Sequence, residues 1–311
     1  MTVITPNEQT RKRIEKKIKE GRGQGFKSEY KPWLEVNELS SRGTSHRVYS
    51  SKTNRVSHLL SNLENCAFNV FVWADCVEDI REQYPLLPIE STLQIAEKMG
   101  IKHPSFNDKQ NGQLLTVMTT DFLVTEIDPD SGTKRDHAFS VKMASDLNNA
   151  RVREKLDIEA EYWNQQGVQF HILTERELIS DVVKAIEAVN SCADQVQFQK
   201  MSSEWHRKHF TEFVQLLQEF PTRNLTELAN KFDLDHNMPS GESLNLLFFW
   251  ISQKRLPINL NAKLPLQMNQ VKDIVPMEEL ERIISTEGGG QNDFAQCSVP
   301  RCGQWEDAAG S

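Results

Sequence analysis

The chain has 311 residues, of which 38% are hydrophobic, and a formal net charge of −8 at pH 7. This length has room for about two domains with cores of their own. No apolar run approaches the roughly 20 residues of a membrane-spanning helix, and no signal-peptide core opens the chain, so we expect a cytoplasmic protein without a membrane segment. Five cysteines, odd in number and without a CxxC pair, favour reduced thiols over a disulfide framework.

The charge is distributed unevenly along the chain. Residues 1–60 hold thirteen lysines and arginines against six acidic residues, a net charge of +7, so residues 61–311 carry −15. This basic arm in front of an acidic body indicates contact with a polyanion. A solvated basic helix over 7–20 is the alternative interpretation. Four of these thirteen basic residues cluster in or just before a predicted hairpin at 44–57 and are suited to phosphate contacts: Arg42, Arg47, Lys52 and Arg55.

Glu64 stands on the apolar face of a helix that the hydrophobic spacing predicts over 58–73. It lies four residues after Leu60 and four before Phe68, so it projects with them. A buried carboxylate without a partner costs several kcal/mol, so Glu64 needs a cation, a metal or a hydrogen-bond donor. The alternative is a side chain at the edge of the stripe that reaches water.

Asp121 and Lys142 belong to two predicted strands, 117–124 and 138–143, joined by turn-forming residues at 128–132. A turn centred between Ser131 and Gly132 places Asp121 directly opposite Lys142, with Cβ atoms about 5 Å apart. A structural ion pair across the strands is the simpler interpretation. The presence of Glu64 as a third charged residue favours a catalytic role for the pair.

The remaining elements of the first domain alternate between strand and helix. They are a strand at 77–87, a helix at 91–99, a long helix at 149–166 and a strand at 168–173. This order predicts an α/β layer with a mixed sheet. We place the end of the first domain at residue 175.

The second domain, residues 176–285, is predicted to be mainly helical. Three helices at 205–219, 224–232 and 240–254 precede an alternating segment at 257–264, the order of a winged helix. Residues 200–285 contain ten basic and eleven acidic residues. Because the third helix shows Leu246, Phe249 and Trp250 beside few cations, it favours a protein partner over phosphate. Residues 286–311, with Cys297 and Cys302, are predicted to be a disordered tail or linker.

Glu64, Asp121 and Lys142 reproduce the layout of the PD-(D/E)xK restriction-endonuclease-like fold. Further segments resemble successive signatures of TnsA, the endonuclease subunit of Tn-seven-like heteromeric transposases. They are KEGRGQG (19–25), YKPWL (30–34), SHRVYS (45–50), DIREQYPL (79–86), GIKHP (100–104), TDFLV (120–124) and EKLDIEAEYW (154–163). The resemblance runs from about residue 13 to about residue 280.

The resemblance implies a magnesium site, with Mn²⁺ as a substitute. Asp121 is the central ligand and Glu64 the second, while Val141 offers its backbone carbonyl and Lys142 orients the attacking water. Ser140 occupies a metal-site position where the fold has Asp or Glu and TnsA has Gln. Its short neutral side chain reaches a metal only through water or a closer backbone, which weakens the case for a second metal and, to a lesser degree, for activity.

Glu159 matches an acidic position of the family on the long helix. It is a candidate for a water-mediated metal contact, and the alternative is a solvated acid on a polar helix face.

The implied function is cleavage of the 5′ ends of a transposon, with a partner transposase, TnsB, cutting the 3′ ends. The C-terminal domain would engage TnsC, an AAA+ regulator. Two alternatives stay open: a free-standing restriction- or resolvase-like endonuclease, and a silent adaptor between TnsB and TnsC. The sequence leaves the DNA-end sequence, the nick position, the stoichiometry and the target-selection route undetermined.

Overall fold

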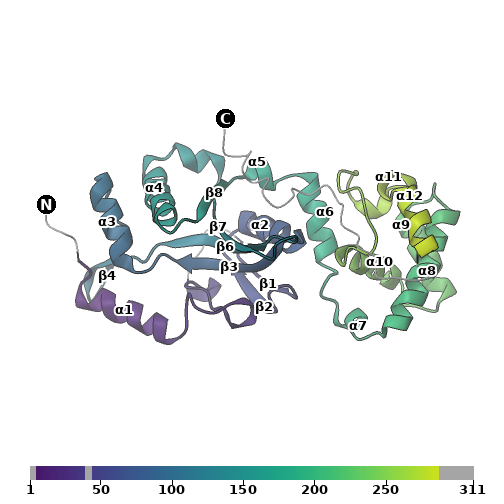
Figure 1. Ribbon diagram of the computed structural model, residues 1–311, viewed down its shortest axis with the longest axis horizontal. Helices are drawn as coiled ribbons and strands as arrows, with labels where there is room; N and C mark the ends of the chain where they lie inside the picture. Colours follow the sequence, from purple (N-terminus) through teal and green to yellow (C-terminus); the bar gives the residue numbers. More distant parts are fainter. Residues whose placement is uncertain (1–4, 39–43, 287–311) are drawn as a thin grey trace. The chain divides into compact units, whose positions relative to one another are not determined.

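The computed structural model describes residues 5–38 and 44–286, and these fall into two compact units that separate between Ile179 and Ser180 (Figure 1). The first unit is an α/β domain and the second is helical. Residue 175, where the sequence placed the boundary, is the first residue of the short helix α5 (Glu175–Leu178). Apart from residue 286, the predicted tail with Cys297 and Cys302 lies outside the described residues.

A four-stranded mixed sheet forms the centre of the first unit. Its strand order is β3 (Val77–Pro85), β6 (Thr119–Ile127), β7 (Lys134–Val141) and β8 (Gln169–Leu173). The β3–β6 and β6–β7 pairs are antiparallel, whereas β7 and β8 are parallel. The predicted mixed sheet is therefore confirmed for this unit.

Helices pack against both faces of this sheet. On one face, α2 (Asn62–Trp73) packs Phe68 and Phe71 against Phe122 and Phe139. The other face packs against α3 (Ile89–Met99) and α4 (Ala150–Gln165), with Ile158 beside Leu123 and Ala138. Neighbouring residues of β6 thus point into two different cores, as the alternation of side chains along a strand requires.

The register of the β6–β7 hairpin differs from the predicted one by two residues. Phe122 pairs with Phe139 and Ile127 with Lys134, so the turn centres between residues 130 and 131. Extending this register places Asp121 opposite Ser140, not opposite Lys142. A shift of two keeps a side chain on the same face, so Asp121 and Lys142 become diagonal neighbours on the face shared with Leu123.

The N-terminal part of the unit packs a small hairpin and a helix beside the sheet. The helix is α1 (Glu8–Lys19), and the hairpin pairs β1 (His46–Ser50) with β2 (Arg55–Leu59). The predicted helix at 58–73 begins only at Asn62, because His58 and Leu59 continue strand β2 and the Ser61 side chain caps the helix. A second hairpin, which pairs β4 (Ser105–Asp108) with β5 (Gly112–Leu115), was not predicted.

The second unit is built from helices. They are α6 (Asp181–Asn190), α7 (Val196–Gln199), α8 (Ser203–Glu219), α9 (Leu225–Asp235), α10 (Glu242–Ser252), α11 (Val271–Ile274) and α12 (Met277–Thr286). The predicted wing is wrong, because residues 257–264 contain no strand. Among the described residues, no helix is long and apolar enough to cross a bilayer.

Helix α10 is the centre of this second unit, not an exposed recognition helix. Leu246 and Trp250 are fully buried and Phe249 is 8% exposed. The Trp250 ring meets the rings of Phe210 and Phe213 from α8. The expectation that α10 offers an apolar surface to a protein partner is therefore wrong: its hydrophobic side chains form the core of the unit.

Candidate active site

Asp121 lies at the start of β6, where donors from the end of β7 surround its carboxylate. Its Oδ2 atom accepts hydrogen bonds from the Val141 backbone N–H at 2.7 Å and from Lys142 Nζ at 2.6 Å. The Ser140 hydroxyl lies 3.3 Å away. Three successive residues, the last two of β7 and Lys142 directly after it, thus fix the orientation of a single carboxylate oxygen.

Lys142 follows the last residue of β7 and makes two contacts. Besides the Asp121 carboxylate, its Nζ donates to the Val141 carbonyl oxygen at 2.9 Å. Burial disfavours the charged form of Lys142, but the carboxylates of Asp121 and Glu159 outweigh burial, so the pKa of Lys142 is raised above its ordinary value. The side chain therefore stays an ammonium ion at neutral pH.

Glu64 lies in the first turn of α2 and is 6% exposed, in agreement with its predicted place on the buried face. Its carboxylate accepts hydrogen bonds from Leu60 N at 2.9 Å, Ser61 Oγ at 3.1 Å and Gln83 Nε2 at 3.2 Å. Burial, followed by the negative charge of Asp121, raises the pKa of Glu64 to about 7. The donors hold the carboxyl group in place while its charge is disfavoured.

Gln83 also belongs to the site, although in the sequence it stands out only as part of the DIREQYPL segment (79–86). Its backbone has a φ of 50°, which a non-glycine residue adopts rarely, and its side chain is buried. Its amide donates to Glu64, and its carbonyl oxygen accepts from Thr119 Oγ1 at 3.3 Å. Gln83 therefore links the first turn of α2 to the start of β6, a role that no spacing rule indicates.

Glu159 is the residue whose setting departs most from expectation. It is 4% exposed on α4, so the solvated acid considered from the sequence is wrong. Burial raises its pKa to about 8, and the charge of Asp121 adds to this effect, whereas Lys142 and hydrogen bonds with Thr120 and Ser140 oppose it. Its Oε1 atom is buried without a hydrogen-bond partner among the described residues.

The donor chemistry of this group fits a hard divalent cation. Glu64, Asp121 and Glu159 supply carboxylate oxygens and Val141 a carbonyl oxygen, the atoms that Mg²⁺ prefers. Lys142 is the cation that opposes these carboxylates, and one buried oxygen of Glu159 has no donor. Ser140, 1% exposed, donates its one hydroxyl hydrogen to Asp121 and is also in hydrogen-bond contact with Glu159.

Two of the four basic residues proposed for phosphate contact are used inside the fold. Arg55 is buried against Glu82, with its Nη1 atom 2.7 Å from Oε1. Lys52 donates to the carbonyl oxygens of Ala74 and Val77, and burial lowers its pKa to about 8. That part of the prediction is wrong. Arg47 is exposed, and Arg42 lies outside the described residues.

The mixed sheet, with an aspartate and a lysine at the ends of β6 and β7 and a glutamate on each of the helices α2 and α4, defines an endonuclease-like α/β domain. Residues 74–175 match the family model described as TnsA-like endonuclease N terminal, and this range contains Asp121, Lys142 and Glu159. Over 232 residues, the chain is 40% identical to the Transposon Tn7 transposition protein TnsA of Escherichia coli. The alignment covers 75% of this chain and 80% of that protein.

The chain therefore belongs to the TnsA family.

Proposed function

We propose that this chain is the magnesium-dependent DNA endonuclease subunit of a heteromeric transposase, which hydrolyses the phosphodiester bond at the 5′ ends of the transposon. The proposal rests on the arrangement of buried Glu64, buried Glu159 and half-buried Asp121 around one lysine. Three carboxylates beside a single ammonium ion form a poor hydrophobic core and a good cation site.

Asp121, Glu64 and the Val141 carbonyl would hold the metal, and Glu159 would bind it directly or through water. Mg²⁺ would supply charge neutralisation at the scissile phosphate and help to lower the pKa of the attacking water. Lys142, whose raised pKa keeps it charged, orients that water and donates to a non-bridging phosphate oxygen. Val141 N–H and Ser140 hold Asp121 in one orientation throughout.

We further propose that TnsB cuts the 3′ ends and that TnsC engages the C-terminal unit. Family membership supports this partnership, and the charge of −15 on residues 61–311 supports dependence on partners for DNA affinity. The surface of the second unit that meets TnsC lies outside the core residues of α10. The exposed basic side chains of α1, among them Arg11, Lys16 and Lys19, are candidates for direct phosphate contact.

A strand-resolved cleavage assay tests the proposal. Transposon-end DNA labelled separately on each strand is incubated with this chain, TnsB, TnsC and Mg²⁺, and the products are separated on a denaturing gel. We expect 5′-strand cleavage that requires the full set of proteins and the metal. Site-specific cutting by this chain alone would favour a free-standing endonuclease. Unchanged 5′ cleavage by the Asp121→Asn variant would assign the chain the role of a silent adaptor.

A further inference from the structure

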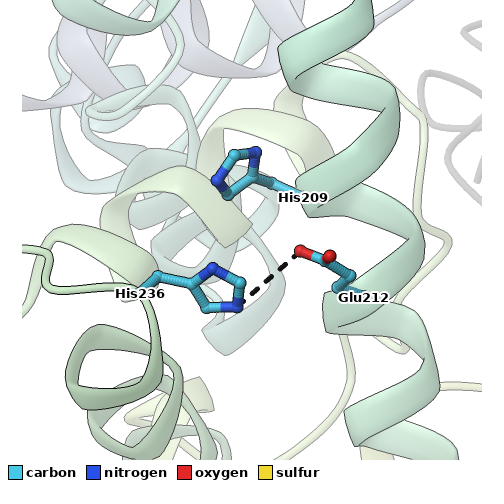
Figure 2. A group of neighbouring side chains, drawn as sticks. All are labelled: His209, Glu212 and His236. Atoms are coloured by element: carbon cyan, nitrogen blue, oxygen red, sulfur yellow. Dashed lines mark ion pairs between the residues drawn. The ribbon is translucent and has the colours of Figure 1, made fainter.

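A second group of side chains that could bind a metal lies within the helical unit. His209 and Glu212 lie on α8, three residues apart and so on one face of the helix, and His236 is the C-cap residue of α9. One ligand atom from each residue lies within 4.8 Å of the other two. Figure 2 shows the Glu212 carboxylate directed at the His236 ring, with His209 beside them.

The hydrogen bonds of this group leave ligand atoms available. The Nδ1–H of His209 donates to the Trp205 carbonyl oxygen at 2.8 Å, because a carbonyl can only accept. This bond fixes the tautomer in which Nε2 carries the free lone pair, the arrangement that metal-bound histidines commonly show. The Oε2 atom of Glu212 is buried and accepts no hydrogen bond within the described chain.

An ion pair between His236 and Glu212 does not account for the group. The His236 Nε2 atom lies 3.7 Å from Glu212 Oε2, which is longer than a hydrogen bond. Such a pair would also leave Nε2 of His209 unused. A cation between the three residues would give the buried Oε2 atom a partner and engage both imidazoles.

Aromatic contacts hold both rings in place. The His209 ring stacks on Trp205 with centroids 4.0 Å apart, and the His236 ring stacks on Phe232 with centroids 3.9 Å apart. Phe213 and Phe232 pack between α8 and α9 with centroids 4.8 Å apart, which fixes the two helices relative to each other. The ligands therefore come from a packed scaffold, as a metal site requires.

We propose that His209, Glu212 and His236 bind a zinc ion that ties the C-terminal end of α9 to α8. Two imidazole nitrogens, which are borderline ligands, and one carboxylate oxygen make a ligand set that zinc sites use. Tetrahedral coordination at bond lengths of about 2.0–2.1 Å places ligand atoms roughly 3.3 Å apart, so the side chains must close by about 1.5 Å at most. All three residues are partly exposed, so the Glu212 carboxylate can move toward the two stacked rings and water can take the fourth position.

The test is metal binding by the full-length chain, in a background that removes the carboxylate site of the first unit. Metal-free protein carrying Glu64→Gln and Asp121→Asn is titrated with Zn²⁺ by calorimetry, and with Co²⁺ followed by visible absorption. We expect one equivalent of Zn²⁺ per chain and the intense visible bands of tetrahedral Co²⁺. Adding His209→Gln or His236→Gln should abolish both signals, whereas Glu219→Gln, an exposed acid on the same helix, should change neither.

A thermal melt keeps the result interpretable if a histidine variant folds poorly. Zn²⁺ should raise the Tm of the background protein and leave the Tm of the Glu212→Gln variant unchanged. The proposal is overturned if the background protein binds no stoichiometric Zn²⁺, or if Zn²⁺ binding survives all three substitutions. Because the carboxylate site is removed throughout, failure here does not bear on the proposed nuclease.

Discussion

Lys142 Nζ lies 2.6 Å from Asp121 Oδ2, although the two residues are diagonal neighbours in the β6–β7 pair and not opposite one another. The residue opposite Asp121 in the extended register is Ser140. Its hydroxyl and the Val141 N–H also donate to the Asp121 carboxylate, and Lys142 contacts the same oxygen from just beyond the strand end. The strand end therefore supplies three different donors to one carboxylate, and only one of them carries charge.

Substituting Asp121 by Asn should reduce 5′-strand cleavage by about 100-fold or more, because the charge that holds both the metal and Lys142 is lost. Cleavage is measured on end-labelled DNA in the presence of the partner proteins. Asp130→Asn, in the exposed turn between β6 and β7, is the matched control and should keep wild-type activity. Equal activity of the two variants would contradict the assignment of the site.

Ser140→Ala should lower cleavage by roughly 10-fold while leaving substrate binding intact. The hydroxyl of Ser140 donates to Asp121 and hydrogen-bonds Glu159, and second-layer donors to metal ligands have effects of this size. The comparison is kcat against Kd for DNA, with the exposed Ser203→Ala as control. Wild-type kcat in Ser140→Ala would show that the residue only fills space.

The metal-free protein should become less stable as pH rises from about 4.5 to about 8. The folded-state pKa values of Glu64, about 7, and Glu159, about 8, lie above the ordinary value of 4.5. In this window the unfolded chain has lost protons that the folded chain retains, so the free energy of unfolding falls by up to roughly 1.4 kcal/mol per pH unit and group.

Urea denaturation in EDTA at several pH values measures this slope. Glu159→Gln should flatten it, and Mg²⁺ should stabilise the wild-type protein more at pH 8 than at pH 6, since metal binding displaces those protons. A slope that Glu159→Gln leaves unchanged would show that the buried carboxyl group does not retain its proton.

Arg55→Met should reduce the free energy of unfolding by about 3–5 kcal/mol, because Glu82 would be left buried without its cationic partner. Glu82 is fully buried and also accepts from the His58 backbone N–H, so this pair joins the β1–β2 hairpin to β3. Lys12→Met, which breaks an exposed pair with Glu8, should leave the free energy of unfolding unchanged, and urea denaturation of the two variants beside the wild type measures the contrast.

Residues 1–179 should fold cooperatively without the second unit, and residues 1–175 should be less stable by about 1.5–3 kcal/mol. Leu178 of α5 is 4% exposed and belongs to the core under α2, so ending the chain at residue 175 removes a buried leucine. Denaturant melts of the two fragments measure the difference. Equal stability would place α5 outside the folding unit.

The alternation of strands and helices, the mixed sheet, the burial of Glu64 and the family resemblance could all be read from the sequence, because hydrophobic periodicity and local motifs encode them. The register of the β6–β7 hairpin could not, since the turn-forming residues permit more than one centre. The place of Gln83 in the site could not be predicted either, because its backbone has a positive φ that no local sequence rule indicates.

The second unit shows most clearly what the sequence alone does not predict. The sequence of an apolar helix has the same pattern whether the helix forms a core or an interface. Leu246 and Trp250 are interior because α10 packs against α8, which only the tertiary structure shows. His209 and His236 are 27 positions apart in the sequence. Their approach, like that of Glu64 and Glu159 to Asp121, depends on how helices cross, which is set by the fit of side chains distant in the chain.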